Sequence, residues 1–282
     1  MKYCLIIPAF NEQAYIGLTL QSLVSQTRVA EQIIVVDDNS TDQTAAVVRE
    51  YQAHYPTIDL VRLTSDRIHL PGSKVVQAFQ AGYAHLDGIP EVVVKLDADL
   101  ILPPDYFEKV LAVFERDPKA GMVGGFAYIE KNGQWVLENL TDQDHIRGAF
   151  KAYRHTFFEQ MGGLKPAMGW DTVDELLCRF YHWRVITLPE LRVKHLKPTG
   201  ANYDKTARYK QGESFYRLHY GLAITAIASA KLALKKKRPA LFFDYIRGYF
   251  QAKNQKQTYL VTEEQGRFIR AYRWGKIKSK LF

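Results

Sequence analysis

The segment Val92–Asp99, VVVKLDAD, decides the fold of this 282-residue chain. Its first five residues form an apolar run interrupted only by Lys95, which is typical of a buried strand in a parallel sheet. Asp97 and Asp99 follow directly, so both carboxylates lie at the carboxyl end of this strand. Carboxylates on alternate residues can approach one ion, and hard oxygen ligands suit Mg²⁺ or Mn²⁺. The segment therefore predicts an α/β sheet with a divalent-metal site at its edge, although an acidic turn that caps the next segment is the structural alternative.

Apolar runs and helical patterns alternate on both sides of this segment, as they do in βα units. The patterns predict strands at residues 3–7, 32–36, 60–63, 92–96, 122–129, 135–137 and 185–188. They predict helices at 16–24, 40–53, 73–86, 105–116, 146–161 and 174–183, the second with a capping box formed by Ser40 and Gln43. Strand signals stop near Ala201. We therefore expect an open, mostly parallel sheet flanked by helices over residues 1–200, and a C-terminal helical region over 201–282.

The net charge of +8 is distributed unevenly along the chain. Residues 1–204 contain 20 Lys and Arg against 26 Asp and Glu, a balance of −6, whereas residues 205–282 contain 18 against 4, a balance of +14. The apolar segment 221–234 ends in the basic cluster Lys235–Arg238, and apolar residues recur at three and four positions within 242–250. These features predict amphipathic helices that contact an anionic membrane surface. A helical pair packed on the body is the alternative, and nucleic-acid binding is not expected because the sequence has no recognition motif for it.

The cysteines and the hydropathy indicate the compartment. Cys4 and Cys178 provide neither a disulfide framework nor a metal-ligand spacing, which fits a reducing compartment. No run reaches the roughly 18–20 apolar residues needed to cross a bilayer. The sequence therefore predicts a cytoplasmic protein that is peripheral on the inner face of the plasma membrane.

Two further polar sets follow other predicted strands, namely Pro8–Glu12 and Asp37–Asp42. Ligands of open α/β sheets bind outside the carboxyl ends of the strands, so we expect these sets to converge with Asp97 and Asp99. Carboxylates of the second set can accept hydrogen bonds from a nucleobase or a ribose, although helix capping is the structural alternative. Lys74 and Arg67 could pair with phosphate or be ordinary surface charges.

Three strings in this order, Pro8–Glu12 (PAFNE), Val35–Asp42 (VVDDNSTD) and Lys95–Asp99 (KLDAD), resemble the family 2 glycosyltransferases of GT-A fold. The resemblance covers about residues 1–200 and implies a nucleotide-sugar donor, a divalent metal and an inverting transfer. It implies that the nucleoside contacts the first two strings and that the metal lies at the third. The residues implied to bind the nucleotide sugar are Pro8, Ala9, Phe10, Glu12 and Asp38. Asp97 is implied to lie near the ribose or the metal, and Asp99 and His195 to bind the metal.

The resemblance also implies an acidic general base after a glycine-containing segment. The family's usual Glu-Asp order is reversed here to Asp174-Glu175, and Asp171 is an additional carboxylate. We favour Asp174 as the base, with Glu175 and Asp171 as competitors, because a carboxylate there would accept the proton of the acceptor hydroxyl. Stabilisation of a helix N-terminus is the structural alternative for these acids. Trp170 could stack on a sugar or belong to the core.

These features predict a metal-dependent inverting glycosyltransferase with Mn²⁺ or Mg²⁺ as cofactor. It would transfer sugar from a UDP- or GDP-sugar to a hydroxyl of a glycan or lipid-linked acceptor, in cell-surface polysaccharide synthesis. Single addition is favoured over processive synthesis, because the nearest match to the processive Gln-x-x-Arg-Trp signature is only Arg270–Trp274. The alternatives are a sugar nucleotidyltransferase and a non-catalytic, membrane-associated nucleotide-binding adaptor.

Overall fold

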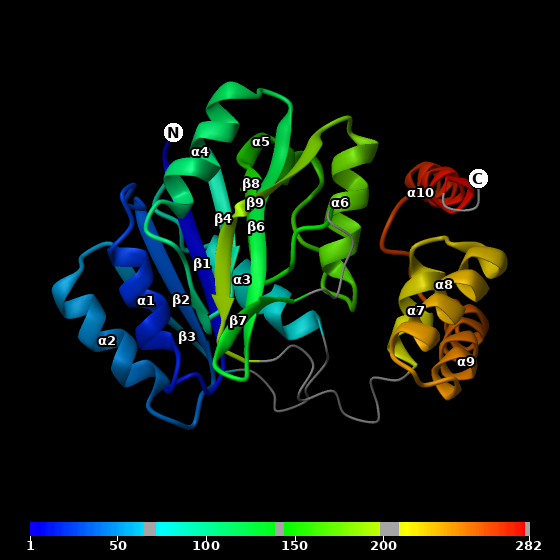
Figure 1. Cartoon of the computed structure of the whole chain (residues 1–282), viewed down its shortest axis with the longest axis horizontal. Coiled ribbons are helices and arrows are strands. Elements are labelled where there is room, and N and C mark those ends of the chain that lie inside the picture. The colour runs from blue at the N-terminus through cyan, green and yellow to red at the C-terminus, as the bar shows by residue number, and fades with distance from the viewer. Residues whose placement is uncertain (65–71, 139–143, 198–208, 280–282) are drawn as a thin grey trace.

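The computed structural model describes residues 1–64, 72–138, 144–197 and 209–279. Its centre is one nine-stranded sheet in the order β3-β2-β1-β4-β8-β6-β9-β5, with β7 paired to β6. Helices surround this sheet, and the helices of the C-terminal region gather at one end of the molecule (Figure 1). This mixed α/β arrangement confirms the predicted fold class.

The first half of the sheet is parallel. It consists of β1 (Tyr3–Ala9), β2 (Gln32–Asp38), β3 (Ile58–Leu63) and β4 (Val92–Leu96). The apolar runs of β1, β2 and β4 are buried along nearly their whole length, as expected for strands covered on both faces. The connecting helices are α1 (Ile16–Val24), α2 (Thr44–His54) and α3 (Ser73–Tyr83). The parallel strands all end at the same edge, so this half positions the polar sets that follow β1, β2 and β4.

The second half of the sheet mixes the two strand directions. Its strands are β5 (Leu100–Ile101), β6 (Ala120–Lys131), β7 (Gln134–Leu137), β8 (Phe150–Arg154) and β9 (Arg184–His195), and its helices are α4 (Tyr106–Arg116), α5 (His155–Gln160) and α6 (Trp170–Phe180). Strand β8 is antiparallel to β4 and β6, and β9 is parallel to β6. The end of β9 also pairs with β5, which places His195 opposite Leu100. This pairing brings His195 next to Asp99 across 96 residues of sequence.

The prediction of a helix over residues 146–161 is wrong. Residues Phe150–Arg154 form strand β8, and only His155–Gln160 are helical. The strand inserts between β4 and β6 and is buried on both faces, including Lys151, so it shows no period-2 alternation that would have identified it. Tertiary pairing overrides the local pattern here.

Two helix starts also differ from the prediction. Helix α2 begins at Thr44 with Gln43 as its N-cap, so the Ser40–Gln43 capping box does not form. Asp42 accepts a hydrogen bond from the Thr44 amide (2.9 Å) instead. Helix α6 begins at Trp170 rather than at residue 174, after Gly169 in a left-handed conformation (φ 80°). The loop before α2 is therefore longer than predicted, and the loop before α6 is shorter.

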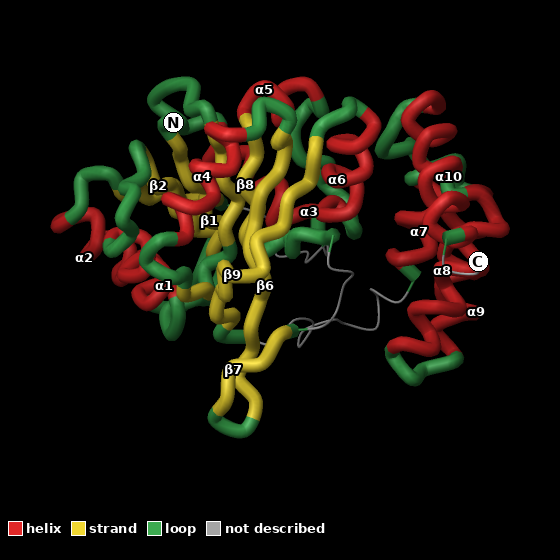
Figure 2. Tube along the Cα trace, turned by 45° about the horizontal axis from the view of Figure 1, so that its top comes forward, coloured by secondary structure: helices red, strands yellow, loops and turns green. Residues whose placement is uncertain are grey.

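The basic C-terminal region contains α7 (Lys210–Arg217), α8 (Gly221–Lys235), α9 (Ala240–Asn254) and α10 (Glu263–Lys278). These helices stack beside α6 (Figure 2), and Phe215, Ile224 and Ile269 belong to the same hydrophobic core as the sheet. Phe268 of α10 meets Phe180 edge-on, with ring centroids 5.5 Å apart. The region therefore packs on the body. None of the described helices is both long enough and apolar enough to span a bilayer.

Candidate active site

The three polar sets converge on one cleft of about 510 Å³ at the carboxyl edge of the parallel strands. Its lining contains seven of the eight residues expected to bind the nucleotide sugar, namely Pro8, Ala9, Phe10, Glu12, Asp38, Lys74 and Asp97, together with Asp99. The eighth, Trp170, does not line it. Arg67 lies outside the described residues.

The loops after β1 and β2 form one unit at the cleft. The main-chain N–H of Asn11 donates to Ser40 Oγ (2.9 Å), and the side-chain oxygen Oδ1 of Asn11 accepts from the main-chain N–H of Thr41 (2.9 Å). The Glu12 amide donates to Thr44 Oγ1 (2.7 Å). Asn11 and Asn39 both have positive φ (54° and 63°), a conformation that asparagine adopts more readily than most residues. Ser40, which the sequence indicated as a helix cap, therefore joins the loop after β1 to the loop after β2 through Asn11.

Two carboxylate oxygens in this cleft lack partners. Glu12 Oε2 and Asp38 Oδ1 are buried and have no hydrogen-bond partner within the described structure. A buried acceptor without a donor costs about 1–3 kcal/mol, so these atoms fit a ligand that brings N–H or O–H groups. Burial raises the pKa of Glu12, while the contacting ammonium of Lys197 acts in the opposite direction. Nucleobase and ribose donors match both acceptors.

Asp97, Asp99 and His195 form a cluster that fits a divalent metal. One potential ligand atom from each residue lies within 4.8 Å of the others. His195 Nε2 is 3.4 Å from Asp99 Oδ2, and both side chains are buried. Burial alone would lower the pKa of His195, but the carboxylates of Asp99 and Glu138 raise it to about 9. Two carboxylates with an imidazole form an oxygen-rich set of the kind that suits Mg²⁺ or Mn²⁺.

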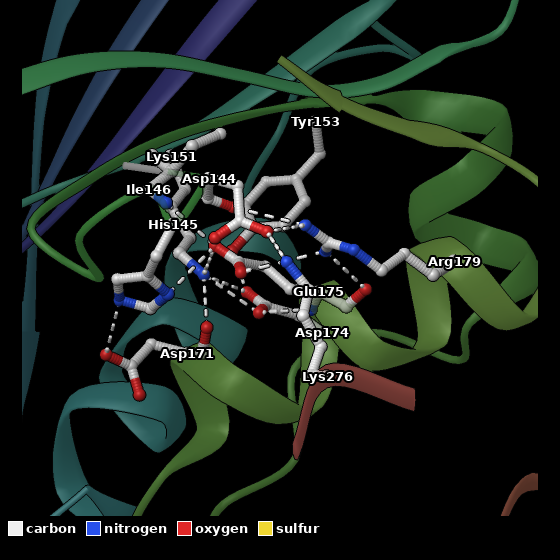
Figure 3. A network of polar contacts seen from close by, with 10 residues as sticks. All are labelled: Asp144, His145, Ile146, Lys151, Tyr153, Asp171, Asp174, Glu175, Arg179 and Lys276. Carbon is white, nitrogen blue, oxygen red and sulfur yellow. Dashed lines mark hydrogen bonds and ion pairs between the residues drawn. The ribbon is translucent and has the colours of Figure 1, made fainter. Parts of the chain in front are cut away.

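The acids at the start of α6 take part in one network of polar contacts (Figure 3), but their side chains differ in solvent exposure. The Asp174 side chain is 2% exposed and accepts from Lys151 Nζ (2.8 Å) and from the Tyr153 hydroxyl (2.6 Å). Burial raises the pKa of Asp174, although Lys151 opposes this effect. Glu175 is 8% exposed, accepts from the Ile146 amide (2.8 Å) and lies 3.1 Å from His145 Nδ1. Both carboxylates are therefore committed to partners inside the protein.

Asp171 differs from these two acids because its side chain is 35% exposed. Its main-chain oxygen accepts from Lys151 Nζ (2.5 Å), and its carboxylate is 3.9 Å from His145 Nε2. Gly148 lies between Asp171 and the Asp97–Asp99–His195 cluster. On one side, a Cβ added at Gly148 would be 3.1 Å from Asp171 Cβ. On the other side, the Gly148 carbonyl accepts a hydrogen bond from Lys95 Nζ (2.8 Å). Lys95 in turn contacts Asp97. Asp171 thus lies close to the Asp97 end of the cleft.

Trp170 is buried beside Lys95 and Lys151, which are paired residues of β4 and β8. Its ring lies 5.3 Å from Lys95 Nζ and 5.8 Å from Lys151 Nζ, and only 7% of the residue is exposed. The environment matches the core alternative that the sequence left open for this residue.

Sequence reasoning missed several residues of this site, including Lys151, Tyr153, His145, Glu138 and Lys197. Lys151 and Tyr153 fall within the segment wrongly expected to be a helix. Glu138 and Lys197 reach the site only through the pairing of distant strands, for which single-sequence patterns carry no signal.

A mixed α/β sheet with a carboxylate-lined cleft at its edge is the arrangement found in GT-A glycosyltransferases. Residues 4–163 match the family model "Glycosyl transferase family 2". The chain belongs to glycosyltransferase family 2 and is a glycosyl-transferring enzyme. Family membership favours this activity over the nucleotidyltransferase and adaptor alternatives.

Several relatives are glycosyltransferases by name, and solved structures share the fold. The chain is 29% identical over 245 residues to an uncharacterized glycosyltransferase of Nostoc sp., covering 80% of this chain and 73% of the relative. It is 27% identical over 206 residues to a probable glycosyltransferase of Bacillus subtilis, covering 64% of this chain but only 47% of the relative. The fold is similar to that of a Pyrobaculum calidifontis mannosyltransferase solved with GDP-Man and Mn²⁺, with a TM-score of 0.59, 17% identity and coverage of 91% and 88% of the two chains.

Proposed function

We propose that the enzyme is a metal-dependent inverting glycosyltransferase that adds one sugar from a nucleotide diphosphate donor to a hydroxyl of a glycan or lipid-linked acceptor. Cell-surface polysaccharide synthesis is the proposed setting. The observation that carries this proposal is the convergence of two unpartnered carboxylate oxygens, on Glu12 and Asp38, with the Asp97–Asp99–His195 cluster in one cleft. The similar mannosyltransferase fold, solved with GDP-Man and Mn²⁺, supports the same combination of ligands.

Asp97, Asp99 and His195 are proposed to hold Mn²⁺ or Mg²⁺. When bound, such an ion supplies positive charge that offsets the charge of a leaving diphosphate. Glu12 and Asp38 are proposed to accept hydrogen bonds from the nucleoside, and Pro8, Ala9 and Phe10 to form the wall beside it. Lys74 lines the same cleft and is proposed to contact the diphosphate.

We propose Asp171 as the general base, in place of Asp174, which the sequence favours. Asp174 and Glu175 are buried and already accept hydrogen bonds, whereas the Asp171 side chain is 35% exposed and adjoins Gly148, whose carbonyl accepts from the lysine that contacts Asp97. Asp171 would accept the hydroxyl proton as the acceptor oxygen bonds to the anomeric carbon, and the nucleoside diphosphate would leave with the electron pair of the broken bond. A single displacement of this kind inverts the anomeric centre.

Calorimetric titration with UDP- and GDP-sugars, each with and without Mn²⁺, tests the donor and metal parts of the proposal. We expect one nucleotide class to bind at least about 10-fold more tightly with Mn²⁺ present, because the ion links the diphosphate to the Asp97–Asp99–His195 cluster. Asp38→Asn is expected to weaken that binding, since it replaces one of the two carboxylate oxygens by an N–H donor and removes the negative charge. Failure of both nucleotide classes to bind with Mn²⁺ would contradict the proposal.

We further propose that residues 201–282 form the membrane-contacting part of the enzyme, at the cytoplasmic face of the plasma membrane. Leu234 and Phe243 lie on either side of the turn between α8 and α9 and are 77% and 71% exposed. The cluster Lys235–Arg238 occupies the same turn. Apolar side chains that enter the headgroup region beside lysines attract an anionic bilayer, at about 1 kcal/mol per basic residue.

Flotation with anionic vesicles tests this surface in the intact chain. Deleting the region would expose apolar residues of the body that pack against it, such as Phe180, so point variants are the cleaner choice. We expect Leu234→Ser combined with Phe243→Ser to lower vesicle partitioning at least about 10-fold, because each buried apolar side chain contributes roughly 1.5–3 kcal/mol. Ile89→Ser is the control, since Ile89 is 83% exposed on the body. If the double variant floats as well as this control does, the membrane contact does not lie at the α8–α9 turn.

A further inference from the structure

The imidazole of His195 lies between two buried carboxylates. Its Nε2 is 3.4 Å from Asp99 Oδ2 on the metal-cluster side, and its Nδ1 is 3.6 Å from Glu138 Oε2 on the other side. The three side chains of Asp99, His195 and Glu138 are only 9%, 8% and 4% exposed. Within the described structure, Nδ1 has no hydrogen-bond partner at shorter range. Glu138 is therefore the acceptor available to the Nδ1 proton.

Glu138 is fixed in this position by the sheet and by an arginine. It follows β7 directly, and its amide donates to the Ala127 carbonyl of β6 (2.9 Å). Its Oε2 accepts from Arg147 Nη1 (2.6 Å), and the Arg147 side chain is itself mostly buried. A buried carboxylate is costly unless it is paired, and Arg147 provides that pairing without displacing Glu138 from His195.

Glu138 does not line the nucleotide cleft and is not part of the metal cluster. Glu138 approaches Nδ1 of His195, whereas Asp99 faces Nε2. Glu138 therefore does not lie on the side of the imidazole where an ion held by Asp99 and His195 would bind. A histidine that binds a metal through one nitrogen usually donates its other N–H to a carboxylate or carbonyl, which fixes the tautomer and the ring orientation.

We infer that Glu138 is a positioning residue of the metal centre. It accepts the hydrogen bond from His195 Nδ1–H and so holds the Nε2 lone pair toward the ion shared with Asp97 and Asp99. The inference rests on the metal site of the proposed function. It makes the end of the β6–β7 hairpin, 57 residues before His195, a structural part of that centre.

The positioning role of Glu138 can be measured apart from activity as the affinity for Mn²⁺ without donor. The electron paramagnetic resonance signal of free Mn²⁺ reports this affinity. We expect Glu138→Gln to weaken Mn²⁺ binding about 10- to 100-fold, the usual effect of removing an outer-shell partner of a metal ligand. Glu130→Gln is the matched control, because Glu130 lies on the same hairpin and is exposed. Glu138→Asp, which keeps the carboxylate, is expected to retain part of the affinity.

A second background separates positioning from general loosening of the fold. In a His195→Gln protein, Glu138→Gln is expected to cause no further loss of Mn²⁺ affinity, because its effect passes through the imidazole. The inference is overturned if Glu138→Gln binds Mn²⁺ like the unmodified chain, or if it loses the same factor in both backgrounds. Failure of the unmodified chain to bind Mn²⁺ would instead overturn the proposed metal site itself, and the positioning role with it.

Discussion

Glycosyl transfer is expected to fall at least about 100-fold when Asp99 is replaced by asparagine, and its stimulation by Mn²⁺ is expected to disappear. Asn keeps the shape of the side chain but removes the negative charge that faces His195 at 3.4 Å. Loss of one group that stabilises the leaving charge typically costs 10²–10³-fold in rate.

Release of nucleoside diphosphate at increasing Mn²⁺ concentrations measures this effect. Asp105→Asn is the control, because Asp105 lies six residues further along the chain and forms a surface ion pair with Lys109. That variant is expected to behave like the unmodified enzyme. An Asp99→Asn enzyme with full activity and an unchanged Mn²⁺ response would exclude Asp99 from the metal site.

Replacing Asp171 by asparagine is expected to lower kcat about 10²–10⁴-fold while leaving donor affinity and thermal stability unchanged. The range is that of a general base removed from a proton transfer. The carboxylate of Asp171 is partly exposed and lies 3.9 Å from His145 Nε2, a weaker contact than the 2.8 Å pair of Asp174 with Lys151, so its loss is expected to leave the fold intact. By contrast, Asp174→Asn removes the principal partner of fully buried Lys151 and is expected to destabilise the protein by about 3–5 kcal/mol.

The two variants therefore separate a base from a structural acid. Single-turnover kinetics reports the chemical step, and urea unfolding reports stability. The assignment of Asp171 fails if Asp171→Asn retains normal kcat. It also fails if Asp174→Asn is as stable as the unmodified enzyme yet inactive, since Asp174 would then act in the chemistry rather than in the core.

The parts of the site that local sequence could predict are those carried by the parallel strands. Asp38, Asp97 and Asp99 directly follow or end buried apolar runs, and the carboxyl ends of parallel strands meet at one edge. The strand periodicity and the sheet direction were therefore enough to place these carboxylates in one cleft. The fold class followed from the same alternation of strands and helices.

The remainder depends on contacts that no local pattern reports. Lys151 lies on β8, a strand buried on both faces whose composition resembles that of a helix, so no local pattern predicts the strand or the contact of Lys151 with Asp174. The start of α6 at Trp170 follows from the left-handed turn at Gly169 and decides that Asp171 rather than Asp174 is accessible. Glu138 and His195 meet only because β6 pairs with β9.

The decisive measurement is the release of nucleoside diphosphate by the unmodified enzyme with its best donor. It is made in Mn²⁺, after EDTA treatment, and after Mn²⁺ is restored. We expect release in Mn²⁺, its loss in EDTA, and its recovery when the ion is returned to the Asp97–Asp99–His195 cluster. Release that continues undiminished in EDTA would contradict a metal-dependent transfer at this site.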